Sequence, residues 1–140
     1  ARGIVKAFGS FRAVDGANLV VAESELIGLI GPNGAGKSTF FNCLSGDAEP
    51  TSGTIHFRST EVTRLPPDAH ARLGLARTFQ VPIVFSGMTV RENVMVGAFL
   101  RHVSRRAAAA KAEELLEFTG LAERADAQAT SLGTPGRKRL

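Results

Sequence analysis

The sequence predicts an α/β fold built on a parallel sheet, and three adjoining stretches support this prediction. Leu26–Ile30 is apolar on both faces, as expected of a central strand in a parallel sheet. The stretch from Gly31 to Thr39 matches the pattern G-x-x-x-x-G-K-[ST]. Lys37–Leu44 then predicts a helix, because Phe40 and Leu44 lie one turn apart and a glycine follows as a stop. The order of strand, glycine loop and helix is the one that this pattern requires.

The glycine loop has a composition suited to phosphate groups. It consists of Gly31, Pro32, Asn33, Gly34, Ala35, Gly36, Lys37, Ser38 and Thr39. Its glycines leave no Cβ to hold a ligand away, so successive backbone N–H groups can surround an anion at the positive end of a helix. Lys37 adds a positive charge where the outer phosphates of a nucleotide would lie, and Ser38 offers a hydroxyl to a bridging Mg²⁺. We therefore predict a P-loop NTPase core; a glycine-rich turn that fits the pattern by chance is the alternative.

Length and composition are those of an ordinary soluble domain. The chain has 140 residues, of which 44% are hydrophobic and 21% charged. No apolar run approaches the roughly 20 residues needed to span a bilayer, and no secretion signal is expected at the start. Cys43 is the only cysteine. It is expected to be a small buried hydrophobic residue in a reducing compartment.

The chain is basic, with a net charge of +4 and a pI near 10.0. Its basic residues are scattered, apart from Arg105-Arg106 and the run Arg137–Arg139, and no aromatic residues interleave with them. Solvated helix faces explain this pattern better than a nucleic-acid surface does. No nucleic-acid partner is expected.

Further strands are predicted on both sides of the loop. Apolar runs separated by turn residues predict a small antiparallel sheet from Ile4–Phe8 and Ala17–Val21, a strand at Thr54–Phe57 and another at Leu75–Phe79. Gln80 stands at the end of the last of these, and Pro82 interrupts any further ladder. Phe8, an aromatic residue that ends a strand, is on its own more often a core residue than a ligand contact.

Helices are predicted in the second half. Pro66-Pro67-Asp68 opens a short helix that Gly74 closes. Thr89 and Glu92 fit a capping box. The helix that follows would bury Val90, Val94 and Ala98. Ser104–Thr119 predicts a longer helix with the stripe Ala108, Ala112, Leu115 and Leu116. Gly120 would end it and return Leu121 onto Leu116.

Four segments together resemble the ATP-binding subunit of ABC transporters. They are GPNGAGKSTFFNCLSG, TSGTIHF, LARTFQ and MTVRENV, and the resemblance covers essentially the whole chain. It is strongest to the importers of branched-chain amino acids, in which RTFQ is followed by F-x-x-M-T-V-x-E-N. The resemblance implies a partial domain with three parts: an antiparallel β part at 1–24, a core from the P-loop to the glutamine loop at 25–80, and part of a helical subdomain at 81–140.

The resemblance also implies how ATP and Mg²⁺ are held. Phe8 would stack on adenine, with Val14 as an apolar neighbour of the base. Lys37 would neutralise the β- and γ-phosphates, Ser38 would bind Mg²⁺ and Thr39 would contact the α-phosphate. In a separate part of the chain, Gln80 would approach Mg²⁺ and the attacking water and would report the nucleotide state.

The partners implied by the resemblance are transmembrane permease subunits and a second ATP-binding subunit, identical or different. The surface from Val81 to Ala98 would receive a cytoplasmic helix of the permease. The subunit would then lie in the cytoplasm, on the inner face of the cell membrane.

Two departures from the family pattern stand out. The signature falls at Leu132–Gly136, where Gly133 replaces the signature serine and Pro135 stands at the second glycine position, although Arg137–Leu140 continues the pattern. No apolar run followed by Asp-Glu occurs, so the family's Mg²⁺-holding aspartate, catalytic glutamate and the switch histidine after them have no counterparts. The three histidines of the chain, His56, His70 and His102, are expected to be surface or structural residues.

Without those segments, the sequence predicts nucleotide binding with negligible turnover, and whether the chain is itself an enzyme stays open. In the family's sheet, further strands lie between the loop strand and the glutamine strand. The chain alone is therefore expected to expose sheet edges and apolar faces, and to be unstable or self-associating. Two other readings remain: a nucleotide-binding module that does not hydrolyse, and a soluble ABC protein outside transport. A small GTPase is disfavoured, because no Asn-Lys-x-Asp motif occurs.

Overall fold

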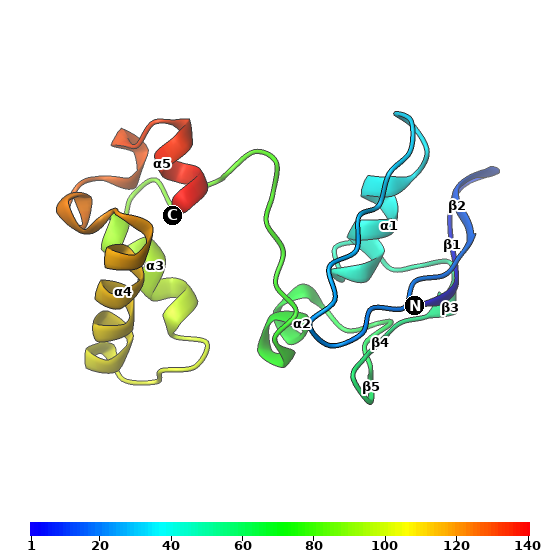
Figure 1. Cartoon of the computed structure of the whole chain (residues 1–140), viewed down its shortest axis with the longest axis horizontal. Coiled ribbons are helices and arrows are strands. Elements are labelled where there is room, and N and C mark those ends of the chain that lie inside the picture. The colour runs from blue at the N-terminus through cyan, green and yellow to red at the C-terminus, as the bar shows by residue number, and fades with distance from the viewer. The chain divides into compact units, whose positions relative to one another are not determined.

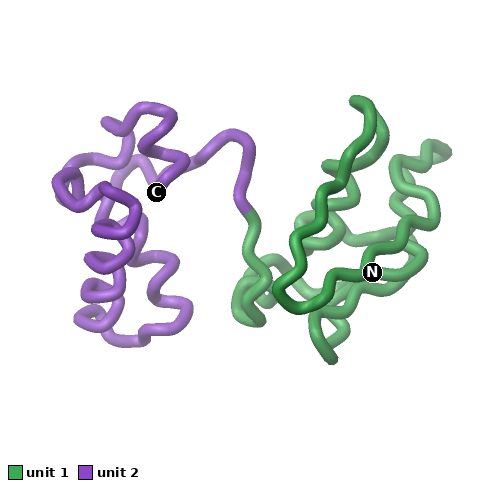
Figure 2. Tube along the Cα trace, in the orientation of Figure 1, with its two compact units in different colours: residues 1–77 green, residues 78–140 purple.

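The computed structural model describes residues 1–140, which form two compact units, 1–77 and 78–140 (Figure 2). The first unit contains β1 (Arg2–Phe8), β2 (Phe11–Ala17), α1 (Lys37–Leu44), β3 (Ser52–Thr54), β4 (His56–Phe57), β5 (Thr60–Glu61) and α2 (Pro67–Leu73). The second contains α3 (Val90–Ala98), α4 (Arg105–Thr119), the short 3₁₀ turns η1 (Ala122–Arg124) and η2 (Ala129–Ser131), and α5 (Thr134–Arg139) (Figure 1). None of these helices has the length and apolar character needed to cross a bilayer.

The three-stranded sheet has the order β2-β1-β3 and is antiparallel throughout. Strand β1 contains the predicted strand Ile4–Phe8. The prediction of its partner at Ala17–Val21 was wrong, because β1 and β2 are joined by a two-residue turn that pairs Phe8 directly with Phe11. In a tight hairpin the two residues that flank the turn pair with each other. The partner strand therefore begins at Phe11, earlier in the chain than the apolar run suggested.

The parallel strand pairing predicted around the loop is not formed. Leu26–Ile30 and Leu75–Phe79 belong to no strand, and Leu26 and Ile30 are 98% and 92% exposed. A strand exists only where a neighbour accepts and donates its backbone hydrogen bonds. Neither segment has such a neighbour in residues 1–140. This agrees with the expectation that further strands separate the two segments in the family's sheet.

The core of the first unit lies between α1 and the sheet. Its buried residues are Ile4, Val14, Phe40, Cys43, Ile55 and Val62. Cys43 is buried as predicted, and burial raises the pKa of its thiol. Ile55 is buried at the break between β3 and β4, so the predicted strand Thr54–Phe57 is divided in two. The short helix predicted before Gly74 is α2.

His70 is the buried polar residue of the first unit. Its Nε2 lies 2.9 Å from the carbonyl oxygen of Val62, and its Nδ1 has no hydrogen-bond partner. Gly46, just after α1, lies close to the imidazole ring. The prediction of a structural role for His70 agrees with this position, which joins α2 to the chain around β5 and α1.

Helices α3 and α4 form the centre of the second unit. The capping box is confirmed: Glu92 N donates to Thr89 Oγ1 at 3.2 Å, and Thr89 N donates to Glu92 Oε2 at 2.8 Å. On α4 the residues Ala108, Ala112 and Leu116 are buried as predicted, whereas Leu115 is only partly buried. Met95 takes a core place on α3, where Val94 is only partly covered.

The chain after α4 returns to the start of α3. Gly120 ends α4 in the left-handed conformation, and Leu121 N donates to Leu116 O at 2.8 Å, as predicted. Further on, Val90 N donates to Ala127 O at 2.9 Å and Arg91 N to Ala125 O at 2.8 Å. The first turn of α3 is therefore held by backbone carbonyls of 125–127 as well as by its own cap.

Candidate functional site

The glycine loop leads directly into α1 (Figure 1). Gly36 is the N-cap residue of α1, and Phe40 N donates to Gly36 O at 2.8 Å as the first hydrogen bond of the helix. The N–H groups that precede this bond have no partner inside the helix. No side chain caps them, and the first turn contains no acidic residue. The start of α1 is thus an exposed end of a helix dipole with free donors.

Gly36 lies against strand β2. A Cβ placed on Gly36 would stand 2.1 Å from the carbonyl oxygen of Ala13, and the residue has a φ of 79°. The backbone of the loop can approach β2 this closely only because residue 36 has no side chain. This contact fixes where α1 begins relative to the sheet.

Lys37 folds back over the loop. Its Nζ donates to Gly31 O at 2.7 Å and to Pro32 O at 2.6 Å. The ammonium group is held by neutral carbonyl oxygens and has no carboxylate partner in the loop. An anion at the mouth of the loop would be a stronger acceptor than these carbonyls, so the charge is available to a phosphate group.

The loop residues fit a phosphate ligand and a divalent cation. Free N–H donors, one lysine and an exposed Ser38 lie within one turn of each other, and no acidic side chain competes with an incoming anion. Thr39 is partly buried in the same turn. The donor set is that of a nucleotide triphosphate site with a hydroxyl ligand for Mg²⁺.

The two residues expected near adenine lie on the β1–β2 hairpin. Phe8 is 57% exposed at its end, and Lys6 Nζ lies 5.2 Å from the centre of the phenyl ring. An exposed ring is able to stack on a base, so the core alternative for Phe8 is wrong. Val14 is buried with Phe40 and lies close to Gly36. Val14 therefore packs under the glycine loop as part of the core, and its contact with a base stays a prediction.

Gln80 and the signature segment belong to the second unit, while the loop belongs to the first. Gln80 is exposed. In the signature segment Gly133 is the N-cap of α5, which begins at Thr134 and has Pro135 in its first turn. A proline in the first turn of a helix is favourable, so this variant of the signature is compatible with a helix start. The roles of these residues at a nucleotide stay predictions.

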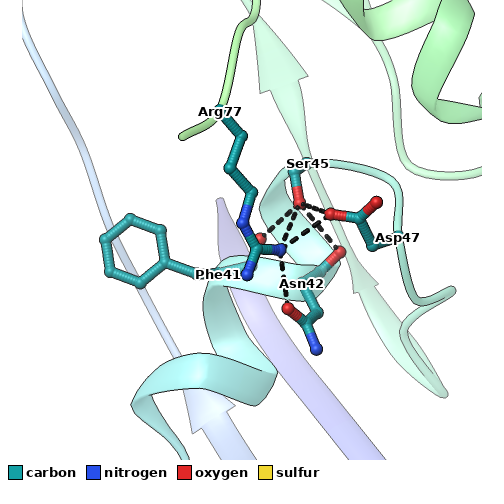
Figure 3. Close-up of polar contacts among 5 residues, drawn as sticks. All are labelled: Phe41, Asn42, Ser45, Asp47 and Arg77. Carbon is teal, nitrogen blue, oxygen red and sulfur yellow. Dashed lines mark hydrogen bonds and ion pairs between the residues drawn. The ribbon is translucent and has the colours of Figure 1, made fainter. Parts of the chain in front are cut away.

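A polar cluster around Arg77 was not predicted from the sequence. Its Nη1 donates to Asn42 Oδ1 at 2.6 Å, to Asp47 Oδ2 at 2.7 Å and to Ser45 Oγ at 3.1 Å (Figure 3). The sequence predicted only a strand at Leu75–Phe79 around Arg77. Its partners are separated from it by 30 to 35 residues, so no local pattern could have revealed them.

The comparison with protein families now decides the assignment. The sequence model of the ABC transporter family matches residues 14–140, which include the loop, the Arg77 cluster and the signature segment. The chain belongs to this ABC transporter family.

Relatives of this ABC transporter chain include LivG, the high-affinity branched-chain amino acid transport ATP-binding protein. LivG of Salmonella typhimurium is 40% identical over 153 aligned residues, and LivG of Escherichia coli K12 is 41% identical. BraF of Pseudomonas aeruginosa, with the same described role, is 38% identical over 154 residues. Each match covers 99% of this chain and 60% of the relative, so the chain spans about 60% of the length of these proteins.

Solved structures of ATP-binding cassettes share the fold. A nucleotide-free cassette from an ABC transporter matches with a TM-score of 0.78 and 31% identity, covering 98% of this chain and 62% of that one. The ADP conformation of the cassette MJ1267 gives a TM-score of 0.79 at 31% identity, with 99% and 61% covered. The dimeric cassette MJ0796 gives 0.79 at 22% identity, with 99% and 66% covered, and supports the fold alone. The predicted P-loop NTPase fold class is therefore confirmed, although the parallel pairing is absent from this chain.

Proposed function

We propose that this chain binds the triphosphate of ATP in the loop 31–39. The observation that supports the proposal most directly is the start of α1, where the N–H donors have no side-chain cap, Lys37 has only carbonyl partners and the first turn contains no acid. Related cassettes are described in an ADP conformation and bound to ADP and Pi. Charge-assisted hydrogen bonds contribute roughly 1.5–3 kcal/mol each, so a few of them are enough for useful affinity.

The further roles at the nucleotide follow the family pattern. Ser38 would give its hydroxyl to Mg²⁺, which neutralises phosphate charge when bound, and Gln80 would be a further ligand of the ion. Thr39 would donate to the α-phosphate, and Phe8 would cover one face of the adenine. The exposed ring of Phe8 and the exposed hydroxyl of Ser38 support these two assignments.

We also propose that the protein powers the import of branched-chain amino acids. The support is identity of about 40% to LivG and BraF over almost the whole chain. The partners would be transmembrane permease subunits and a second ATP-binding subunit, as the family pattern implies. The permease would place this subunit at the inner face of the cell membrane. The surface 81–98 would receive a cytoplasmic helix of the permease. Its support is a set of exposed apolar side chains: Val81, Ile83, Phe85, Met88 and Val96.

The decisive experiment is a binding titration with a fluorescent ATP analogue and Mg²⁺. Lys37→Ala removes the only full charge of the loop, so we expect affinity to fall at least ten- to a hundred-fold, about the loss of one charge-assisted contact. Lys111→Ala, which removes a partly buried lysine paired with Glu114 on α4, is the matched control and should bind normally. Unchanged affinity of the Lys37 variant would remove the phosphate assignment.

A second arm of the titration tests the adenine contact. Phe8→Ala removes the exposed ring and should weaken the binding of ATP by about five- to a hundred-fold, since stacking on a base contributes about 1–3 kcal/mol. Competition by inorganic triphosphate should stay as in the unmodified protein, because that ligand has no base. Equal losses for both ligands would show that Phe8 acts on the loop and not on adenine.

A further inference from the structure

The Arg77 cluster ties the last residue of the first unit to the far end of α1. Asn42 lies in the last turn of α1, Ser45 is its C-cap, and Asp47 follows two residues later. The side chains of Arg77 and Asp47 are 26% and 31% exposed, less than those of the ion pairs Arg12–Asp15, Arg64–Glu49 and Arg72–Asp68 in the first unit. The pair is therefore shielded from water on most sides, which makes it less sensitive to salt than an exposed pair.

One guanidinium nitrogen of Arg77 holds all three partners. Nη1 carries two hydrogens, which it shares among Asn42 Oδ1, Asp47 Oδ2 and, at a longer distance, Ser45 Oγ. Ser45 in turn links the cluster to the helix, because its Oγ lies 2.6 Å from Asp47 Oδ2 and 2.9 Å from Phe41 O (Figure 3). The last turn of α1 contains no basic residue of its own, so Arg77 also supplies the positive charge that the negative end of this helix favours.

Arg77 lies only three residues before Gln80 in the chain, so the cluster fixes where the Gln80 segment begins. Arg77 ends the first unit, and Gln80 follows three residues later, so the two Cα atoms are at most about 10–11 Å apart. The opposite end of α1 carries the phosphate loop, and the helix of 8 residues is about 12 Å long. One rigid element thus has the phosphate donors at its start and the anchor of the glutamine segment at its end.

We propose that Arg77 is a positioning residue that couples the phosphate loop to Gln80 through α1. This inference rests on the proposed binding of ATP in the loop. By fixing residue 77 to α1, the cluster fixes the point from which Thr78–Gln80 departs, and it limits the space that Gln80 can search. Arg77 itself touches no ligand in this scheme; it acts by holding the start of the segment that carries Gln80.

The test is hydrogen–deuterium exchange on the intact protein, with and without Mg-ATP, read in peptides that cover 31–44 and 78–88. In the unmodified protein, Mg-ATP should slow exchange in both peptides. In Arg77→Ala, Mg-ATP should still protect 31–44 but should lose most of its effect on 78–88. Arg77→Lys keeps the charge without the planar fork and should give an intermediate loss.

The controls separate coupling from general stability. Arg64→Ala removes an arginine from the exposed pair with Glu49 in the same unit and should leave both effects intact. If Arg77→Ala fails to fold, Asn42→Ala tests the proposal in its place. This variant removes one acceptor of Arg77 and should selectively reduce the protection of 78–88 by Mg-ATP.

Three results would contradict parts of this scheme. Protection of both peptides in Arg77→Ala, equal to that of the unmodified protein, would overturn the coupling role of Arg77. A parallel loss in both peptides would also overturn it and would leave Arg77 as a purely structural residue. No protection of 31–44 in the unmodified protein would instead contradict nucleotide binding in the loop.

Discussion

Gly36 is the residue at which the loop has least freedom. Both Gly36 and Gly34 have left-handed backbone conformations, with φ values of 79° and 82°. Only Gly36 meets another part of the chain, the carbonyl of Ala13, whereas a Cβ on Gly34 would meet nothing within 4 Å. The two positions therefore separate the cost of the backbone conformation from the cost of a collision.

Comparing Gly36→Ala with Gly34→Ala measures that difference. Gly34→Ala should lower the free energy of unfolding by about 1–2 kcal/mol, the cost of a left-handed conformation for an L-residue. Gly36→Ala should lose about 1–3 kcal/mol more, because β2 or the loop must move to make room. Urea titrations followed by circular dichroism give both values. Equal losses in the two variants would mean that the loop moves away from β2 without cost.

Single residues were predictable where their neighbours in sequence define their role. Roles could be proposed for Lys37 and Ser38 because the loop pattern places donors and charges within a few consecutive residues. Arg77 could not be assigned, since its partners come from another part of the chain. Val14 lies in the core, and its expected contact with a base stays a prediction, because a small apolar residue on a strand can serve either place.

Helices were predicted more accurately than strands. The caps of α3 and α4, at Thr89 and Ser104, are signals within one turn, and both occur in the structure. The segments Leu26–Ile30 and Leu75–Phe79 have strand composition but no paired neighbour. A helix satisfies its own backbone, whereas a strand depends on residues that its own sequence does not contain.

The capping box of α3 should give stability a pH dependence. Hydrogen bonds from the backbone N–H and hydroxyl of Thr89 lower the pKa of Glu92. A carboxyl with a lowered pKa stabilises the folded state above its unfolded pKa of about 4.3, and this contribution is lost as pH falls through the lower folded value. Glu92→Gln should therefore be less stable than the unmodified protein at pH 7, with the difference shrinking below about pH 4.

Thermal melts between pH 3 and 7 measure this effect. Glu117→Gln, on the exposed side of α4, is the matched control and should follow the unmodified protein across the range. A constant difference between Glu92→Gln and the unmodified protein at every pH would show that the carboxylate charge plays no part in the cap.

The whole chain exposes more apolar surface than a stable monomer usually does. Leu26 and Ile30 in the first unit and Ile83, Val103 and Phe118 in the second are largely solvent-exposed. The segment 26–30 also leaves its backbone unpaired, so it combines an apolar surface with a free edge. Such segments pair with other chains when nothing covers them.

The chain of 140 residues should therefore self-associate at micromolar concentrations and melt without a sharp transition. Replacing Leu26 and Ile30 by lysine should reduce association, because charge on an edge opposes pairing between chains. Ser59→Lys, at an exposed turn, provides the matched control for added charge. Sedimentation velocity over a range of concentrations measures the outcome, and a compact monomer with one cooperative melt would contradict the expectation.

The return of residues 125–132 to the start of α3 has a mechanical consequence. Ala129 N donates to Met88 O at 3.1 Å, and Leu132 is buried in the same cluster as Val90. A membrane helix seated on residues 81–98 would push on a turn whose hydrogen bonds end only a few residues before Gly133. In the proposed transporter, force on that surface would reach the signature segment 132–136 along one short, hydrogen-bonded path, without any change within α4.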